Sequence, residues 1–231
     1  MRLIRLTSLC DFEQRAECSI ARLRKTEKDR GSPLGCNLPM TIRMGNRPHI
    51  PVLPPEQASD ESRSVYDEFH KRMSFPAPPN FIMTQGHSPT VARGTWELVR
   101  NVLVSGEIPR WLKEMIFVAI SQDRNCGYCR AAHIACCRML GVNPELLDEL
   151  VRDFKSITDL KVRDTIFFAL KCSKNPQSLT EDDYDKLREF GFKESEIVEL
   201  IAMSAFAVYA NIIADATAME PDTMFDEIYS T

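Results

Sequence analysis

From residue 59 onward the sequence repeats the signals that start and stop helices, and this pattern restricts the possible folds most. Ser59 and Ser88 are residues that cap helix N-termini, and Pro89 suits the first helical position. Gly141 and Gly191 suit the end of a helix. Between these signals, apolar residues recur at helical spacing. The expected helices cover roughly residues 59–73, 88–104, 110–123, 125–140, a short helix from 143, 160–174, 181–190 and 194–219.

We find no alternating strand pattern of any length and no solenoid repeat. The sequence therefore predicts an all-α fold, a single helical domain of about seven or eight helices. We place this domain at residues 48–231.

Residues 1–47 differ from the rest of the chain. They hold ten Lys and Arg against five Asp and Glu, a net +5, whereas the remaining residues hold 19 against 28, a net −9. Met40 and Met44 stand just before the domain begins. We interpret this segment as an N-terminal extension, disordered or the product of a start assigned too far upstream. A transit peptide is the alternative, and the five acidic residues count against it.

Composition and charge exclude several function classes. The acidic body is a poor nucleic-acid binder, because that affinity rests on neutralising phosphates. No apolar run approaches the ~20 residues of a membrane span, and "FAVYANIIADATAM" carries Asn211 and Asp215, so we interpret it as a buried helix. The start "MRLIRLTSLCDF" is not a convincing signal peptide. We expect a cytoplasmic protein without nucleic-acid or membrane partners, in which clustered cysteines indicate redox or metal chemistry.

The segment "DRNCGYCRAAHIACCRML" contains four of the eight cysteines. With Asn125 as the cap, Cys126, Cys129 and His133 lie on one stripe of a helix. Cys126 then sits in the first turn, where free N–H groups and the helix dipole favour a thiolate. Cα atoms three residues apart on a helix are roughly 5 Å apart, within disulfide range. Cys126 and Cys129 can therefore cycle between dithiol and disulfide.

Glu114 is unusual because it lies in the nearly apolar helix "WLKEMIFVAI". A carboxylate facing a core needs a proton, a donor or a cation. If this helix packs on the cysteine helix, Glu114 and His133 flank the two thiols and form a proton relay. An exposed Glu114 is the equally open alternative.

Metal binding is a competing role for the cysteine helix. The pattern C-x2-C-x3-H-x2-C offers four zinc ligands, but four ligands along one helix cannot converge on a tetrahedron, so we expect no metal. No Gly-rich phosphate fingerprint or flavin signal is present, and we expect no cofactor. Several further residues receive no catalytic role: Cys136, Cys137 and Cys172 as core, Cys10, Cys18 and Cys36 in the extension, and His49, His70 and His87 as surface or loop residues.

The spacing of Glu114, Cys126-Gly-Tyr-Cys129 and His133 resembles the active-site signature of the alkylhydroperoxidase D / carboxymuconolactone decarboxylase superfamily. The segments "VYDEFHKRM" and "EIVELIAMSAFAVYANIIADAT" are similar to its peroxidase-related branch. The resemblance covers roughly residues 48–222. It implies an all-α fold, homo-oligomers from dimer to hexamer, and a thiol peroxidase or disulfide reductase in antioxidant defence.

The resemblance also implies residue roles. Cys129 is the peroxidatic thiol, Cys126 donates a proton and then resolves the sulfenate, and His133 and Glu114 serve the relay. The helix dipole instead favours Cys126 as the more acidic thiol, so the two arguments disagree on the attacker. The family often has histidine next to the second cysteine, where this chain has Tyr128, a possible auxiliary residue.

Three functions therefore compete. The first is reduction of a hydroperoxide, an apolar organic one in preference, with an external thiol or protein as reductant. The second is a cofactor-free decarboxylase or isomerase that uses His133 and Glu114 as acid and base. The third is a non-enzymatic oligomer whose disulfide senses redox state.

Overall fold

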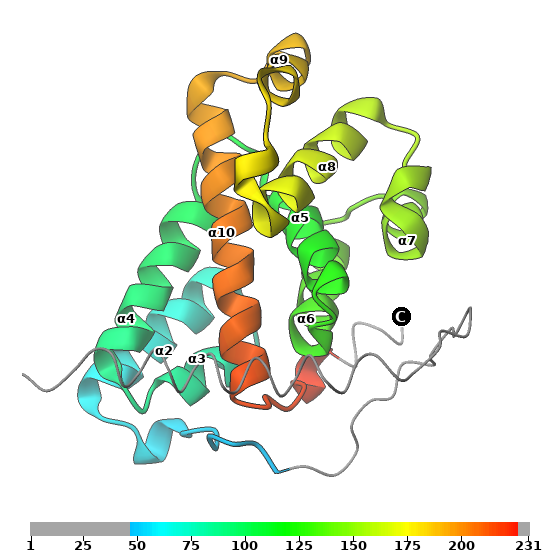
Figure 1. The fold of residues 1–231 in the computed structure, drawn as a ribbon. Coiled ribbons are helices and arrows are strands. Elements are labelled where there is room, and N and C mark those ends of the chain that lie inside the picture. Colours follow the sequence, from blue (N-terminus) through cyan, green and yellow to red (C-terminus); the bar gives the residue numbers. More distant parts are fainter. Residues whose placement is uncertain (1–46, 226–231) are drawn as a thin grey trace, which may run out of the picture. The chain divides into compact units, whose positions relative to one another are not determined.

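A computed structural model of the chain describes residues 47–225, and these residues form nine α-helices without any β-strand. This confirms the all-α fold (Figure 1). The predicted extension, with its cysteines, lies almost wholly outside the described residues. The α-helices are α2 (Asp60–Met73), α3 (Asn80–Gln85), α4 (Pro89–Leu98), α5 (Arg110–Asp123), α6 (Gly127–Met139), α7 (Pro144–Asp153), α8 (Leu160–Lys174), α9 (Glu181–Glu189) and α10 (Glu194–Ala216).

The expected caps account for most helix boundaries. The Ser59 hydroxyl accepts the Ser62 N–H at the start of α2, and the Asp159 carboxylate accepts the Val162 N–H at the start of α8. Gly141 and Gly191 follow α6 and α9 with φ of 71° and 85°, in the left-handed region that favours glycine. Local capping chemistry therefore sets these ends.

Helix α3 was not expected, because it follows directly on the proline-rich "FPAPPN". Its N-terminus has a partner from far along the chain: the Asp222 carboxylate accepts the Asn80 N–H at 2.8 Å. A carboxylate stabilises the free N–H groups of a helix start. A capping contact across more than a hundred residues leaves no local signal in the sequence.

The helix that begins at Pro89 does reach Val104 as expected, but its last turns are a π-helix, Val99–Val104. Lys113 on α5 stabilises the end of this segment. Its ammonium donates to the Val102 carbonyl at 2.8 Å and the Ser105 carbonyl at 2.6 Å, and it pairs with Glu199 at 3.0 Å. Lys113 is only 1% exposed, so its charge is neutralised within the core.

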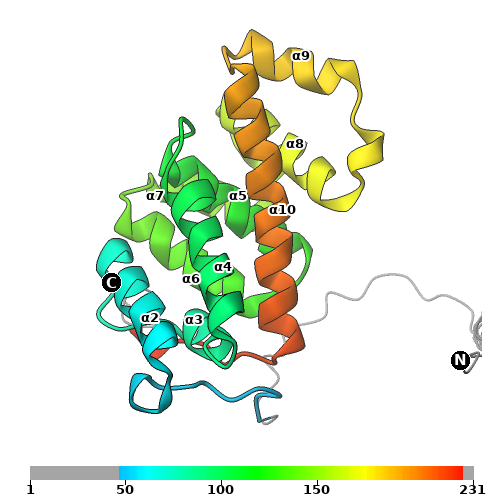
Figure 2. The same cartoon turned by 90° about the vertical axis from the view of Figure 1, so that its left-hand side faces the viewer.

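Helix α5 forms the centre of the core, where it packs against α6, α8 and α10. All of its residues from Leu112 to Ser121 are buried. Figures 1 and 2 show α2, α3 and α4 together at one end of α10 and α8 and α9 at its other end. The expected packing of α5 on the cysteine helix α6 is therefore present, and it brings Glu114 to His133.

Helix α10 is the one helix among residues 47–225 long and apolar enough to cross a membrane by length and composition. Half of its most apolar stretch is buried against the other helices. On the inward side Asn211 is fully buried and donates to the Ser121 hydroxyl of α5 at 2.9 Å. This is the arrangement of a core helix, which the sequence predicted.

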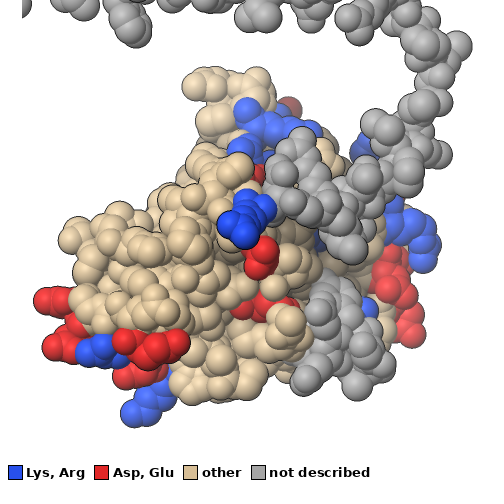
Figure 3. Space-filling view, turned by 90° about the horizontal axis from the view of Figure 1, so that it is seen from below, with Lys and Arg blue, Asp and Glu red and all other residues tan. Residues whose placement is uncertain are grey.

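Figure 3 views the lower face of the molecule, seen from below. On this face the Lys and Arg side chains of the described residues lie close to Asp and Glu side chains, and uncharged surface separates these groups. A nucleic-acid site requires a concentrated basic surface. The mixed charges on this face do not provide one.

The inward and outward faces of α10 make matched substitutions possible. Leu200 is 0% exposed and Val198 is 64% exposed. We expect Leu200→Ala to lower the free energy of unfolding by ~2–5 kcal/mol, since it removes buried methyl groups and leaves a cavity. Val198→Ala should change it by less than about 0.5 kcal/mol. Urea unfolding measures both, and equal effects would contradict the burial of this face.

Candidate active site

The Glu114 carboxylate lies between α5 and α6 and is completely buried. One oxygen accepts a hydrogen bond from the Arg110 Nε at 3.1 Å, and the other contacts the His133 Nδ1 at 2.5 Å. The alternative of an exposed Glu114 is therefore wrong. A buried carboxylate is stable when charge-assisted donors surround it, and here both oxygens have one.

His133 is oriented from two sides. A carboxylate only accepts hydrogen bonds, so Nδ1 carries the proton donated to Glu114, and Nε2 is left free to exchange protons. The Phe117 ring of α5 stacks on the imidazole, with centroids 3.5 Å apart and planes 13° apart. His133 can therefore act as an acid or base at a fixed place.

The start of α6 lies one residue later than expected. Asn125 is not the cap but has left-handed backbone geometry, with φ 57°. Cys126 is the N-cap residue and Cys129 is the third residue of the helix. The free N–H groups of the first turn therefore lie at both thiols, and the Cys126 sulfur itself accepts the Cys129 N–H, which by itself lowers the Cys126 pKa. The dipole argument therefore still disagrees with the resemblance about the attacking thiol, because it favours an anion at Cys126 as well as at Cys129.

The two thiols have different environments. Cys126 is completely buried. Its pKa is raised far above that of an ordinary thiol, first by its hydrogen bond with Cys129 and then by burial and the charge on Cys129, with a further contribution from a hydrogen bond to Asp215. Cys126 therefore keeps its proton.

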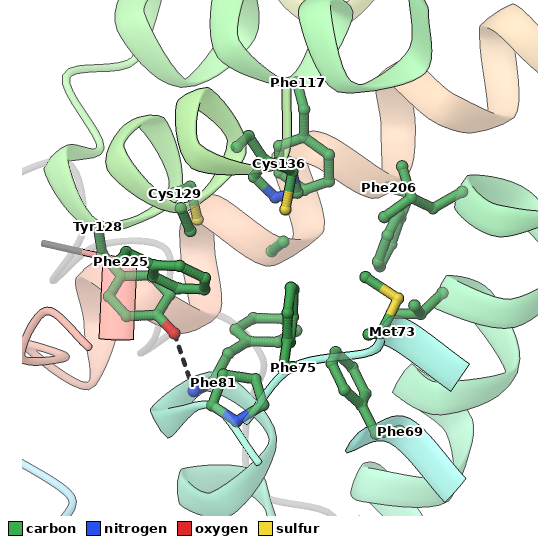
Figure 4. A pocket seen from close by; sticks show the side chains of 16 residues that line it. Phe69, Met73, Phe75, Phe81, Phe117, Tyr128, Cys129, Cys136, Phe206 and Phe225 are labelled. Atoms are coloured by element: carbon green, nitrogen blue, oxygen red, sulfur yellow. Dashed lines mark hydrogen bonds between the residues drawn. The ribbon is translucent and has the colours of Figure 1, made fainter. Parts of the chain in front are cut away.

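A small cavity of about 50 Å³ opens at Cys129. Figure 4 shows the Cys129 and Cys136 thiols among the aromatic side chains around it. Cys126 does not line it, so Cys129 is the thiol of the pair that a molecule in the cavity meets. The lining is mainly apolar and comprises Phe69, Met73, Phe75, Pro79, Phe81, Val99, Leu103, Phe117, Tyr128, Cys129, Ala132, His133, Cys136, Phe206, Ala210 and Phe225.

Tyr128 has both of its hydroxyl functions engaged. The hydroxyl donates to the Asp222 carboxylate at 2.6 Å and accepts the Phe81 N–H at 3.1 Å, the dashed line of Figure 4. Burial and the Asp222 charge raise the pKa of the phenol well above 10. Tyr128 is therefore not a base for the thiols.

Among the described residues, Glu114, His133 and Cys136 offer donor atoms that all lie within 4.8 Å of one another. They are the residues that could hold a metal ion. Glu114 and His133, however, already share a hydrogen bond, and Arg110 brings a positive charge to the same carboxylate. Structural zinc takes four ligands, so this group fits a proton relay better than a metal.

Sequence reasoning missed several residues of the site. Arg110 and Phe117 stand four before and three after Glu114, so helical spacing was an available signal. Cys136, expected to be only core, lies beside Glu114 and lines the cavity. Its burial and then the Glu114 charge raise its pKa well above 9, so it stays protonated. Asp222 and Phe225 carried no signal.

The remaining residues set aside by the sequence analysis do not line the cavity: Cys137, Cys172, His49, His70 and His87. Cys137 is fully buried as expected. Cys172 is partly buried rather than core, and all five cysteines of the described residues are free thiols.

Comparison with known proteins finds a family model that matches part of the chain. Residues 89–153 match the carboxymuconolactone decarboxylase family, and this segment contains Glu114, both cysteines of the pair and His133. A search of curated proteins found no match. The match agrees with the resemblance derived from the active-site spacing.

Solved structures share the fold. An uncharacterized peroxidase-related protein from Ralstonia eutropha JMP134, described as an alkylhydroperoxidase AhpD core, has a TM-score of 0.70 and 27% identity over 77% of this chain and 94% of that one. An uncharacterized peroxidase-related protein from Silicibacter sp. TM1040 has a TM-score of 0.70 and 24% identity over 80% of this chain and 97% of that one. The debrominase Bmp8, in complex with 2,3,4-tribromopyrrole, has a TM-score of 0.67 and 20% identity over 78% of this chain and 95% of that one.

The unequal thiols predict unequal alkylation. Iodoacetamide reacts with thiolates, so at about pH 7.5 the reduced protein should label Cys129, which lines the cavity, at least ~10 times faster than Cys126, which does not line it and keeps its proton. Trypsin releases residues 125–130, which contain only these two cysteines, and fragmentation mass spectrometry locates the label. Faster labelling of Cys126 would contradict the assignment.

Proposed function

Starting from this likeness to the alkylhydroperoxidase D / carboxymuconolactone decarboxylase superfamily and its peroxidase-related branch, we propose that the protein is a thiol-dependent peroxidase that reduces alkyl hydroperoxides through Cys126 and Cys129. At the family level the fold supports a peroxidase-related, antioxidant function. The observation that carries the finer proposal is the position of Cys129. It lines an apolar cavity together with His133, and the protonated Cys126 stands three residues before it.

In the first step the Cys129 thiolate attacks the terminal oxygen of the hydroperoxide. The S–O bond forms as the O–O bond breaks, so sulfur is oxidised to a sulfenic acid and the organic oxygen leaves as an alcohol. The alkoxide needs one proton. His133, held by Glu114, takes up the Cys129 proton on Nε2 as the thiolate forms and returns it to the alkoxide.

In the second step the Cys126 sulfur attacks the sulfenic sulfur of Cys129. The disulfide forms and hydroxide leaves, taking up the Cys126 proton to become water. Cys126 must lose its proton to attack, and the Asp215 carboxylate that contacts its thiol supports a role for Asp215 as the base. Two electrons from an external dithiol or protein reductant then restore both thiols by disulfide exchange.

The cavity supports an organic rather than an inorganic substrate. Six phenylalanines line it, and its few polar side chains are Tyr128, Cys129, His133 and Cys136. An apolar wall stabilises the organic part of a hydroperoxide, and the few polar groups orient its reactive end. We therefore propose an apolar alkyl or aryl hydroperoxide.

A second candidate rests on the relay alone. Glu114 and His133 form an oriented acid–base pair whether or not the thiols react. A decarboxylase or isomerase using this pair needs neither Cys126 nor Cys129. Replacement of both cysteines therefore separates the two functions, since peroxide reduction stops and acid–base catalysis continues.

The thiol pair yields the first prediction for this function. One equivalent of cumene hydroperoxide should remove two daltons from residues 125–130, and a dithiol should restore them. Cys129→Ser should abolish turnover. Cys126→Ser should stop the cycle at a sulfenic acid, which dimedone traps on Cys129. If Cys126 and Cys129 remain fully alkylatable after peroxide treatment, the result contradicts the peroxidase proposal and favours the acid–base candidate.

The relay yields a second prediction. Glu114→Gln keeps the shape but removes the charge that orients His133, so kcat/KM for cumene hydroperoxide should fall by ~10²–10⁴-fold. Glu189→Gln on exposed α9 is the matched control and should leave kcat/KM within about twofold of wild type. Steady-state kinetics with unfolding curves measures both. Wild-type kcat/KM in Glu114→Gln would remove the relay from the mechanism.

A further inference from the structure

After α10 the chain turns back, and Phe225 in the segment that follows lines the cavity. Ala218 has a left-handed φ of 51°, and the Met219 N–H bonds to the Ala214 carbonyl at 3.0 Å, which ends the helix and reverses the chain. Asp222 and Phe225 in the following segment are 7% and 4% exposed. Residues 219–225, called the cover segment below, are therefore packed against the domain.

Hydrogen bonds from two helices hold the cover segment. The Asp222 carboxylate accepts the Tyr128 hydroxyl of α6 at 2.6 Å and the Asn80 N–H of α3 at 2.8 Å. The Asn80 amide donates to the Glu220 carbonyl at 3.1 Å. A buried carboxylate without donors is unstable, so these contacts favour the docked position strongly.

Phe225 closes the cavity from the cover segment. It lines the cavity and meets Phe75 edge to face, with centroids 5.6 Å apart. The cavity of about 50 Å³ has room for only a few water-sized molecules, whereas sites for organic ligands measure ~300–1,000 Å³. With the cover segment docked, an organic molecule does not fit beside Cys129.

We propose that residues 219–225 form a movable cover over Cys129, that the Tyr128–Asp222 hydrogen bond holds it closed, and that Phe225 limits the size of the molecule that reaches the thiol. The substrate part of this statement rests on the proposed peroxidase function. Tyr128 is then a positioning residue that acts through Asp222. This role accounts for a tyrosine where the similar family often has a histidine.

The test measures access to Cys129 without any peroxide. Reduced wild type, Tyr128→Phe and Phe225→Ala are treated with N-phenylmaleimide, and labelling of residues 125–130 is followed by mass spectrometry. Tyr128→Phe removes the hydroxyl that donates to Asp222 but keeps the ring. Tyr184→Phe on α9, whose ring packs on Phe168 outside the cavity, is the matched control.

Cys129 labelling should be about tenfold faster in Tyr128→Phe, the equivalent of ~1.4 kcal/mol lost from the closed state. Phe225→Ala should accelerate it at least as much, and Tyr184→Phe should not change it. Cys137 and Cys172 are internal references in every sample, and their labelling should stay constant because only the cover segment opens.

Two results would contradict the proposal that residues 219–225 form a movable cover. One is an unchanged Cys129 rate in both Tyr128→Phe and Phe225→Ala. The other is equal acceleration at Cys129, Cys137 and Cys172, which means general loosening of the fold. Alkylation needs only a thiol, so a protein without peroxidase activity would still pass or fail this test on its own.

Discussion

The buried Glu114 carboxylate is the constraint on which the site depends. It lies in the central helix α5, with Arg110 on one oxygen and His133 of α6 on the other. Removing one partner of such a buried group costs ~3–5 kcal/mol, so α5 and α6 are fixed relative to each other in the one register that satisfies it. The same register stacks Phe117 on the imidazole and places His133 and Cys129 on one cavity wall.

Local chemistry made much of this predictable. Capping residues and glycines predicted the helix boundaries, and helical spacing predicted that Cys126, Cys129 and His133 lie on one face. The lone acid in an apolar helix indicated that Glu114 is either buried with partners or exposed, and the structure shows that it is buried. The cap of α6 was predicted one residue too early, because Asn125 ends α5: it has left-handed geometry, its N–H bonds to the Gln122 carbonyl, and the Cys126 N–H bonds to the Ser121 carbonyl.

The features that sequence reasoning missed depend on contacts between distant residues. Asp222 meets Tyr128 and the start of α3 across separations of 94 and 142 residues, and Phe225 reaches Phe75. A carboxylate or a phenylalanine near a C-terminus carries no local mark of such a contact. Cys136 was missed for a different reason: a small apolar residue in a core and a thiol on a cavity wall have the same helical spacing.

Lys113 and Glu114 are adjacent buried charges of α5, and they stabilise different parts of the site. Lys113 fixes the carbonyl groups at the end of the π-helix Val99–Val104, and Val99 and Leu103 of that segment form part of the cavity wall. Glu114 orients the imidazole. The shape of the cavity wall and the orientation of its imidazole therefore depend on two separate side chains of one helix. A change in one of these properties does not require a change in the other.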